Sequence, residues 1–151
     1  MTSFVALRTG LLARRGFSTS ACRYFTTAAA KMEMSEINQD SKCVPCEGIG
    51  AALSGEEATE KMKLVKGWSI SDDSKSITKK LKLKNFVSAL DYINRIGQVA
   101  EGQGHHPDLH ITGYQYVQID LMTHALDGLT DNDFIMAVCI DGLPVELSKK
   151  P

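Results

Sequence analysis

The sequence predicts an α+β domain, in which a four-stranded antiparallel sheet carries helices on one of its faces. Residues 68–83 and 109–121 alternate apolar and polar side chains with a period of two, which is typical of β-hairpins with one solvated face. Three stretches with helical apolar spacing lie before, between and after these hairpins. The order helix, two strands, helix, two strands, helix favours an antiparallel sheet covered on one side.

The first helix is expected to begin after Ser54. Ser54 and Glu57 form the S-x-x-E pattern, in which two side chains cap the free backbone N–H groups of a first turn. Gly67 is the expected stop. The predicted apolar side of this first helix consists of Ala58, Met62 and Val65. In the hairpin that follows, the pair Asp72 and Asp73 is expected to form the turn.

The second helix is the clearest in the sequence. Asn85 is a favourable N-cap residue, and Gly102 and Gly104 are expected to end the helix just before a histidine pair. Its predicted apolar face consists of Phe86, Ala89, Leu90, Ile93, Ile96 and Ala100. A third helix is expected after the capping pattern of Thr130 and Asp133, ending before Gly142.

The domain boundaries follow from composition. At 151 residues with 43% hydrophobic residues, the chain has the size and the apolar content of one domain. We expect the folded domain at residues 54–143, a linker that includes the CVPC sequence at residues 33–53, and a tail at residues 144–151. Because a four-stranded sheet has two unpaired edges, we also expect a homodimer or a homotetramer.

Residues 1–32 have the composition of a transit peptide. They hold five of the 17 Lys and Arg residues and none of the 18 Asp and Glu residues. Such a segment, rich in Arg and Ser and broken by charges, predicts an organelle address rather than a secretory signal or a membrane span. A mitochondrial address is the first choice, a plastid address is the alternative, and a basic disordered tail is a third interpretation. The rest of the chain has a net charge of about −6, which disfavours nucleic-acid binding.

Four cysteines are too few and too scattered to predict a disulfide scaffold. Cys43 and Cys46 form a CVPC sequence, but no second Cys pair exists that would complete a zinc site of this kind. A redox pair would be expected to open a helix, whereas Pro45 and Gly48 indicate a loop. A structural or incidental pair is favoured, and metal or redox chemistry is the alternative.

All four histidines lie within twenty residues, at His105, His106, His110 and His124. Imidazole can donate and accept a proton near neutral pH, so the cluster favours proton transfer. Pro107 disfavours helical geometry at the preceding residue, which places the histidine pair on a bend. His110 is expected to face outward from a strand as a surface residue.

A zinc site is the alternative interpretation of the cluster. Its ligands would be His124 with His105, His106 or His110, with Glu101 or Asp133 as a further ligand. The sequence contains no HExxH pattern, and adjacent histidines rarely bind one ion together. It also lacks the G-x-S-x-G, P-loop and GxGxxG patterns of hydrolases, NTPases and dinucleotide enzymes.

The joint pattern resembles the signature of the pterin-4a-carbinolamine dehydratases. The pattern consists of Glu101, the HHP sequence at residues 105–107, Tyr114, His124 and Asp133. The similarity extends over residues 43–142 and includes the KCVPCEG sequence and the Gly67-Trp68 pair. Six residues separate Pro107 from Tyr114 where the animal enzymes have five, and Gly104 stands where they often have a polar residue. The PDLH sequence at residues 107–110 and the CVPCEG sequence at residues 43–48 instead look like the plant and bacterial branch.

The resemblance implies dehydration of a 4a-hydroxytetrahydropterin, such as 4a-hydroxytetrahydrobiopterin, to the quinonoid dihydropterin. It implies that His105 and His124 transfer protons and that His106 holds the hydroxyl group. Pro107 would shape the wall of the site, and Glu101 and Asp133 would orient the pterin ring or the histidines. No cofactor or metal is implied.

The resemblance also suggests partners and two alternatives. A pterin-dependent aromatic amino-acid hydroxylase is the implied functional partner, because the product regenerates its cofactor. One alternative is a binding module that dimerises a partner without turnover, against which the intact histidines argue. The other is an accessory role in another organellar pterin pathway, such as folate or molybdenum-cofactor metabolism.

Overall fold

The computed structural model describes residues 37–45 and 49–149. The transit peptide predicted at residues 1–32 lies outside the described residues, as does Cys46 of the CVPC sequence. The elements are α1 (Gly55–Lys61), the 3-10 helix η2 (Met62–Leu64), β1 (Trp68–Ile70), β2 (Ile77–Lys82), α2 (Phe86–Gln103), β3 (Asp108–Thr112), β4 (Tyr116–Leu121), the 3-10 helix η3 (His124–Leu126) and α3 (Asp131–Asp141). This order confirms the predicted α+β fold.

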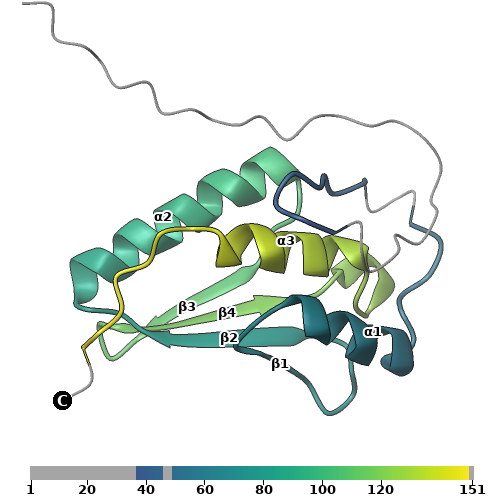
Figure 1. Cartoon of the computed structure of the whole chain (residues 1–151), viewed down its shortest axis with the longest axis horizontal. Coiled ribbons are helices and arrows are strands. Elements are labelled where there is room, and N and C mark those ends of the chain that lie inside the picture. Colours follow the sequence, from purple (N-terminus) through teal and green to yellow (C-terminus); the bar gives the residue numbers. More distant parts are fainter. Residues whose placement is uncertain (1–36, 46–48, 150–151) are drawn as a thin grey trace, which may run out of the picture.

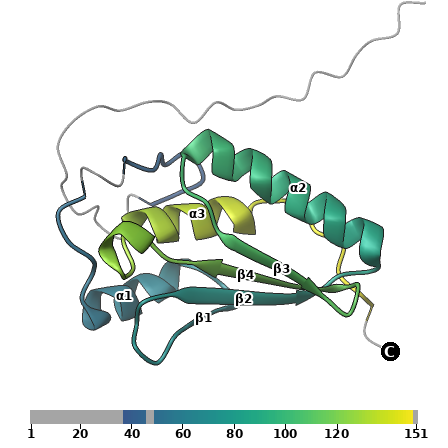
Figure 2. The ribbon, with the colours of Figure 1, turned by 180° about the vertical axis from the view of Figure 1, so that it is seen from behind.

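The four strands form one antiparallel sheet in the order β1-β2-β4-β3. The helices α2 and α3 lie side by side over one face of the sheet, and α1 with η2 packs near β1 and α3 (Figures 1 and 2). The second hairpin therefore lies beside β2, and β3 and β1 form the two edges. The described helices include none that is both long enough and apolar enough to cross a bilayer.

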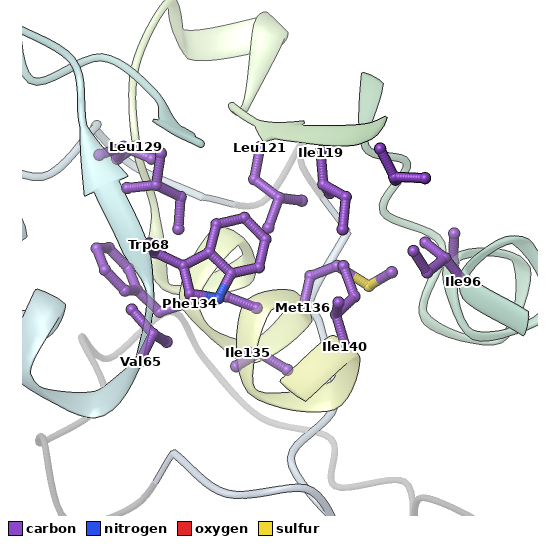
Figure 3. Close-up of a cluster of buried hydrophobic side chains, with 14 of the residues drawn as sticks. Val65, Trp68, Ile96, Ile119, Leu121, Leu129, Phe134, Ile135, Met136 and Ile140 are labelled. Atoms are coloured by element: carbon purple, nitrogen blue, oxygen red, sulfur yellow. The ribbon is translucent and has the colours of Figure 1, made fainter. Parts of the chain in front are cut away.

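The core lies between the sheet and the helices. Ile119 and Leu121 of β4 point toward Phe134, Met136 and Ile140 of α3, and all five side chains are fully buried (Figure 3). Burying one such side chain stabilises the fold by about 1.5–3 kcal/mol, so this layer fixes α3 against β4. The first turn of α3 carries Asp133 of the predicted site, so this packing also positions that residue.

The helix starts follow the capping patterns in the sequence. Ser54 and Glu57 form the expected reciprocal pair, with the Ser54 N–H donating to Glu57 Oε2 at 2.8 Å and the Glu57 N–H donating to Ser54 Oγ at 3.3 Å. Asn85 Oδ1 accepts from the Ser88 N–H at 2.9 Å. The first helix is shorter than predicted, because its last turn tightens into η2 before Gly67, where φ is +75°.

The buried face of α2 differs from the predicted one. It consists of Ala89, Tyr92, Ile96, Ala100 and Gln103. Phe86 and Leu90 were expected to be buried, but they are 48% and 41% exposed, so this part of the prediction was wrong. The apolar residues of this helix cover a wider arc than one packing contact can bury, and docking against α3 and the sheet selects the side with Tyr92.

The segments outside residues 54–143 are also attached to the domain. Within the stretch expected as a linker, Ile37 and Cys43 are 7% and 6% exposed and belong to the core. In the expected tail, the Lys84 N–H donates to the Glu146 carbonyl and the Ser148 N–H donates to the Lys82 carbonyl, both at 2.9 Å. Part of each segment is therefore folded structure rather than free chain.

Candidate active site

Four chain segments meet at one end of the sheet: the end of α2, the start of β3, the end of β4 and the start of α3 (Figure 1). This convergence follows from the antiparallel order, because β3 runs back from the end of α2 and β4 ends beside the start of β3. The Asp108–Asp120 register pair marks this end of the sheet. The predicted site residues are distributed over these four segments.

His105 lies directly after α2 and points into the protein. Gly104 ends the helix in the left-handed conformation with φ +67°, and its N–H donates to the Ala100 carbonyl at 2.8 Å. This conformation favours glycine and turns the chain sharply. The His105 side chain is 5% exposed, and its Nε2 lies 2.8 Å from Asp133 Oδ1. His105 and Asp133 thus form a buried pair that joins the end of α2 to the first turn of α3.

The Asp133 carboxylate is held by several donors besides His105. Its Oδ2 accepts from the Thr130 N–H at 2.7 Å, as part of the α3 cap, and from Thr123 Oγ1 at 2.8 Å. The hydroxyls of Thr123 and Thr130 lie 2.7 Å apart. Because a carboxylate only accepts hydrogen bonds, it fixes a proton on His105 Nε2 and leaves Nδ1 as the ring nitrogen that can accept one.

His106 and His124 are both exposed at the surface. His106 Nε2 lies 3.3 Å from Glu101 Oε1, and these side chains are 62% and 83% exposed. His124 begins η3, is 69% exposed, and its Nε2 lies 3.6 Å from Asp108 Oδ2. Each exposed imidazole therefore has a carboxylate neighbour.

The buried pair and the exposed histidines are connected through their neighbours in the chain. Thr123, which donates to Asp133, directly precedes His124. Asp108, the neighbour of His124, lies two residues after His106, and the half-buried Pro107 separates them. His105 thus contacts the start of α3, whereas the side chains of His106 and His124 contact carboxylates of α2 and β3 nearby in the chain.

His110 is not part of this group. It lies 55% exposed on β3, where its Nε2 is 3.5 Å from Asp120 Oδ2 on the solvated face of the sheet. Gln118 Nε2 and Thr78 Oγ1 also donate to Asp120. This position agrees with the expectation of a surface histidine.

Thr123 and Asp108 contact the predicted site residues Asp133 and His124, although no sequence motif pointed to either of them. Thr123 directly precedes His124, and Asp108 directly follows Pro107. Asp108 lies at the start of β3, opposite Asp120 of β4, so a correct pairing of the second hairpin would have placed it near the end of β4. Within the described part of the chain, no group of three His, Cys, Asp or Glu side chains is arranged to share a metal ion. A cavity of about 460 Å³ lies elsewhere, between α2 and the C-terminal segment; it is lined by Tyr92, Arg95 and Glu146 among others and by none of the histidines.

The segment that carries this site also matches known proteins. Residues 51–143 match the family described as pterin 4 alpha carbinolamine dehydratase. Over 104 residues the chain is 39% identical to a protein of Halorhodospira halophila that is provisionally named a pterin-4-alpha-carbinolamine dehydratase, covering 69% of this chain and 94% of the relative. Over 108 residues it is 40% identical to pterin-4-alpha-carbinolamine dehydratase 2, mitochondrial, of Arabidopsis thaliana, covering 70% of this chain and 58% of the relative.

A solved structure has the same fold. The transcriptional coactivator/pterin dehydratase from Brucella melitensis superimposes with a TM-score of 0.55 at 30% sequence identity, over 60% of this chain and 95% of that chain. The family match covers more than half of the chain and includes every residue of the histidine cluster. The sequence, the sheet order and these comparisons agree, and the chain belongs to the pterin 4 alpha carbinolamine dehydratase family.

Proposed function

We propose that this protein dehydrates a 4a-hydroxytetrahydropterin by histidine acid/base catalysis. Membership of the family supports dehydration of a pterin carbinolamine. The observation that carries the histidine mechanism is the buried His105–Asp133 pair at 2.8 Å, beside the exposed imidazoles of His106 and His124. A proton-transfer site needs groups that can gain and lose protons near neutral pH, and these three side chains supply them.

In the reaction, N5 of the pterin loses its proton, and the hydroxyl group at C4a leaves with a proton as water. The N5–C4a bond becomes a double bond, which gives the quinonoid dihydropterin. One protein group must accept the N5 proton, and another must donate a proton to the hydroxyl. Each proton transfer by a placed group typically contributes about 100- to 10,000-fold in rate.

We assign the two proton transfers to His105 and His124 and the binding of the hydroxyl group to His106. His105 is 5% exposed, so it would contact the pterin only with one edge of its ring. Its Nε2 is committed to Asp133, and Nδ1 would therefore exchange the proton. His124 is 69% exposed and can reach a bound molecule directly.

The remaining predicted residues would bind and orient the substrate. Glu101 is exposed beside His106 and can accept hydrogen bonds from the donor groups of a pterin ring. Pro107 would form part of the wall. Asp133 would act through His105 rather than on the substrate, because its carboxylate is fully buried.

The cellular role is a further part of the proposal. The leader composition and the mitochondrial name of the Arabidopsis relative support a mitochondrial location, with a plastid as the alternative. There the enzyme would regenerate the cofactor of a pterin-dependent hydroxylase or serve another pterin pathway. Exposed apolar residues on α2, which are Phe86, Val87 and Leu90, together with the open edges β1 and β3, support a homo-oligomer.

The test is the rate of dehydration of freshly generated 4a-hydroxytetrahydropterin. We expect His105→Ala and His124→Ala to lower kcat by about 100-fold or more, because each removes a proton-transfer group. His106→Ala should raise KM more than it lowers kcat. His110→Ala is the matched control, because this histidine lies on the sheet surface, and its rate should stay within about twofold of the wild type.

Absence of acceleration by the folded wild-type protein would contradict the proposal. A binding module without turnover would then become the leading interpretation. If His110→Ala lost as much activity as His105→Ala, the proton-transfer site would instead have to include the solvated face of the sheet.

A further inference from the structure

The segment of residues 41–44, here called the strap, contacts both helix ends that carry the buried pair. It lies beside the end of α2 in both views of the ribbon (Figures 1 and 2). Its contacts include long-range hydrogen bonds to two amide side chains, Gln103 and Asn132. Gln103 stands two residues before His105, and Asn132 directly precedes Asp133.

Gln103 is the last residue of α2 and is 7% exposed. Its Oε1 accepts from the Cys43 N–H at 3.0 Å, and its Nε2 donates to the Ser41 carbonyl at 3.0 Å. The side-chain amide thus makes two hydrogen bonds to the backbone of the strap. It attaches the strap to the end of α2.

Asn132 makes the equivalent contact from α3. It is 1% exposed, its Oδ1 accepts from the Val44 N–H at 3.0 Å, and its Nδ2 donates to the Val44 carbonyl at 2.8 Å. The Cys43 thiol also lies 3.6 Å from the Asn132 carbonyl oxygen. Adjacent residues of one segment are therefore tied to both helices.

Together, the two amides fix the distance between the end of α2 and the start of α3. Leaving a buried amide without its partners is unfavourable, so the four hydrogen bonds hold the strap in one register. The strap is thus bound to the end of α2 on one side and to the start of α3 on the other. The His105–Asp133 hydrogen bond of 2.8 Å joins the same two helix ends directly. A change in the separation of the two helix ends must change this distance.

We propose that the strap positions the His105–Asp133 pair, and that Gln103 and Asn132 are positioning residues of the active site. This inference rests on the proposed dehydratase function. It also gives Cys43 a structural role, since its backbone and its buried thiol contact the two helix ends. Displacement of a reacting group by about 1 Å can cost about 100-fold in rate, so loosening the strap should lower activity without removing any catalytic group.

The test compares Gln103→Leu and Asn132→Leu with a control at the other end of α3. We expect both variants to lower kcat by about 10- to 100-fold while KM stays within about twofold. Trp68→Phe is the control: it removes a long-range hydrogen bond, from Trp68 Nε1 to Asp141 Oδ1 at 2.9 Å. Asp141 ends α3, ten residues and about 15 Å from its start. The control substitution should lower the melting temperature but not kcat. All rates are measured at a temperature well below the melting temperature of each variant.

A strap-side variant tests whether the effect passes through the strap itself. Val44→Pro removes the N–H that donates to Asn132 Oδ1, and it changes no residue of either helix. Val44 precedes Pro45, so its backbone is already biased to the extended region that proline adopts. Because Asn132→Leu already breaks the hydrogen bond that Val44→Pro removes, the double variant should lose about as much kcat as Asn132→Leu alone.

A spectroscopic readout distinguishes failure of the positioning role from failure of the proposed function. The imidazole N–H of His105 is hydrogen-bonded and shielded from solvent, so it should give a separate downfield proton signal that is absent in His105→Ala. This signal should broaden or disappear in Gln103→Leu and Asn132→Leu and persist in Trp68→Phe. If the wild type is inactive, the proposed function fails, and this signal still decides the positioning role. Unchanged kcat and unchanged signal in the two variants, with a lower melting temperature, would overturn the inference.

Discussion

At the scale of single residues, the site depends on the carboxylate of Asp133. This side chain is fully buried, and it accepts from an imidazole, a hydroxyl and a backbone N–H at 2.7–2.8 Å. The same residue caps α3 and orients His105. Its structural role and its proposed functional role therefore use different oxygens of one carboxylate.

Asp133→Asn should affect both stability and activity. An amide nitrogen would face either the His105 N–H or the Thr130 N–H, and one buried donor would lose its acceptor. We expect a loss of about 2–3 kcal/mol in the free energy of unfolding, measured by urea denaturation. The dehydration rate should fall by about 100-fold or more, because the histidine could then adopt the other tautomer.

Asp131→Asn is the matched control for this substitution. Asp131 lies in the same helical turn, but its carboxylate contacts Lys61 at 3.0 Å instead of the histidine network. Its dehydration rate should remain near that of the wild type. Equal rate losses in the two variants would mean that His105 orientation does not depend on Asp133.

At the scale of the elements, the end of α2 determines where the histidines lie. Gly104 has φ +67°, which turns the chain from the helix toward β3 within one residue. A side chain at this position would meet no neighbouring atoms, so only the backbone conformation opposes it. Gly97 lies in the middle of the same helix, also with open space around it and without a positive φ.

We expect substitution by alanine to have opposite effects on the free energy of unfolding at these two glycines. Gly104→Ala should lower the free energy of unfolding by about 1 kcal/mol, because the left-handed conformation is unfavourable for alanine. Gly97→Ala should raise it by up to about 1 kcal/mol, because alanine favours a helix interior. Chemical denaturation of both variants measures the difference. Stabilisation by both substitutions would show that the helix end can relax without Gly104.

At the scale of the whole molecule, the packing of α2 against the domain buries Tyr92. Its side chain is 3% exposed, and burial together with the nearby carboxylate of Asp141 raises the pKa of Tyr92 to about 12. A raised pKa means that the folded state favours the neutral phenol. The resulting stability is fully present below about pH 10, the ordinary pKa of tyrosine, and is lost as the pH rises toward 12.

The free energy of unfolding should therefore decrease between pH 10 and pH 12, in part because of Tyr92. Tyr92→Phe removes the ionisable group, so its free energy of unfolding should decrease less over the same range. Urea denaturation at pH 9 and at pH 11 measures both proteins, and lysines contribute equally to each. Identical decreases in the two proteins would assign the alkaline sensitivity to other groups.

Local sequence patterns determined the element order and the helix starts. The pairs Ser54 with Glu57 and Thr130 with Asp133 are three residues apart, and the alternation of the hairpins has a period of two, so their physics is contained in short windows. The HHP bend and the outward position of His110 were predictable for the same reason. Proline and strand parity fix them locally.

Tertiary structure alone decided which of these residues meet. His105 pairs with Asp133 across 28 positions, and the amides of Gln103 and Asn132 hold the strap across 60 to 88 positions. Docking of α2 also selected Tyr92 over Phe86 for burial. A local pattern states what one side chain can do, but its partner depends on how the helices and the sheet pack, because the packing brings distant segments to hydrogen-bond distance.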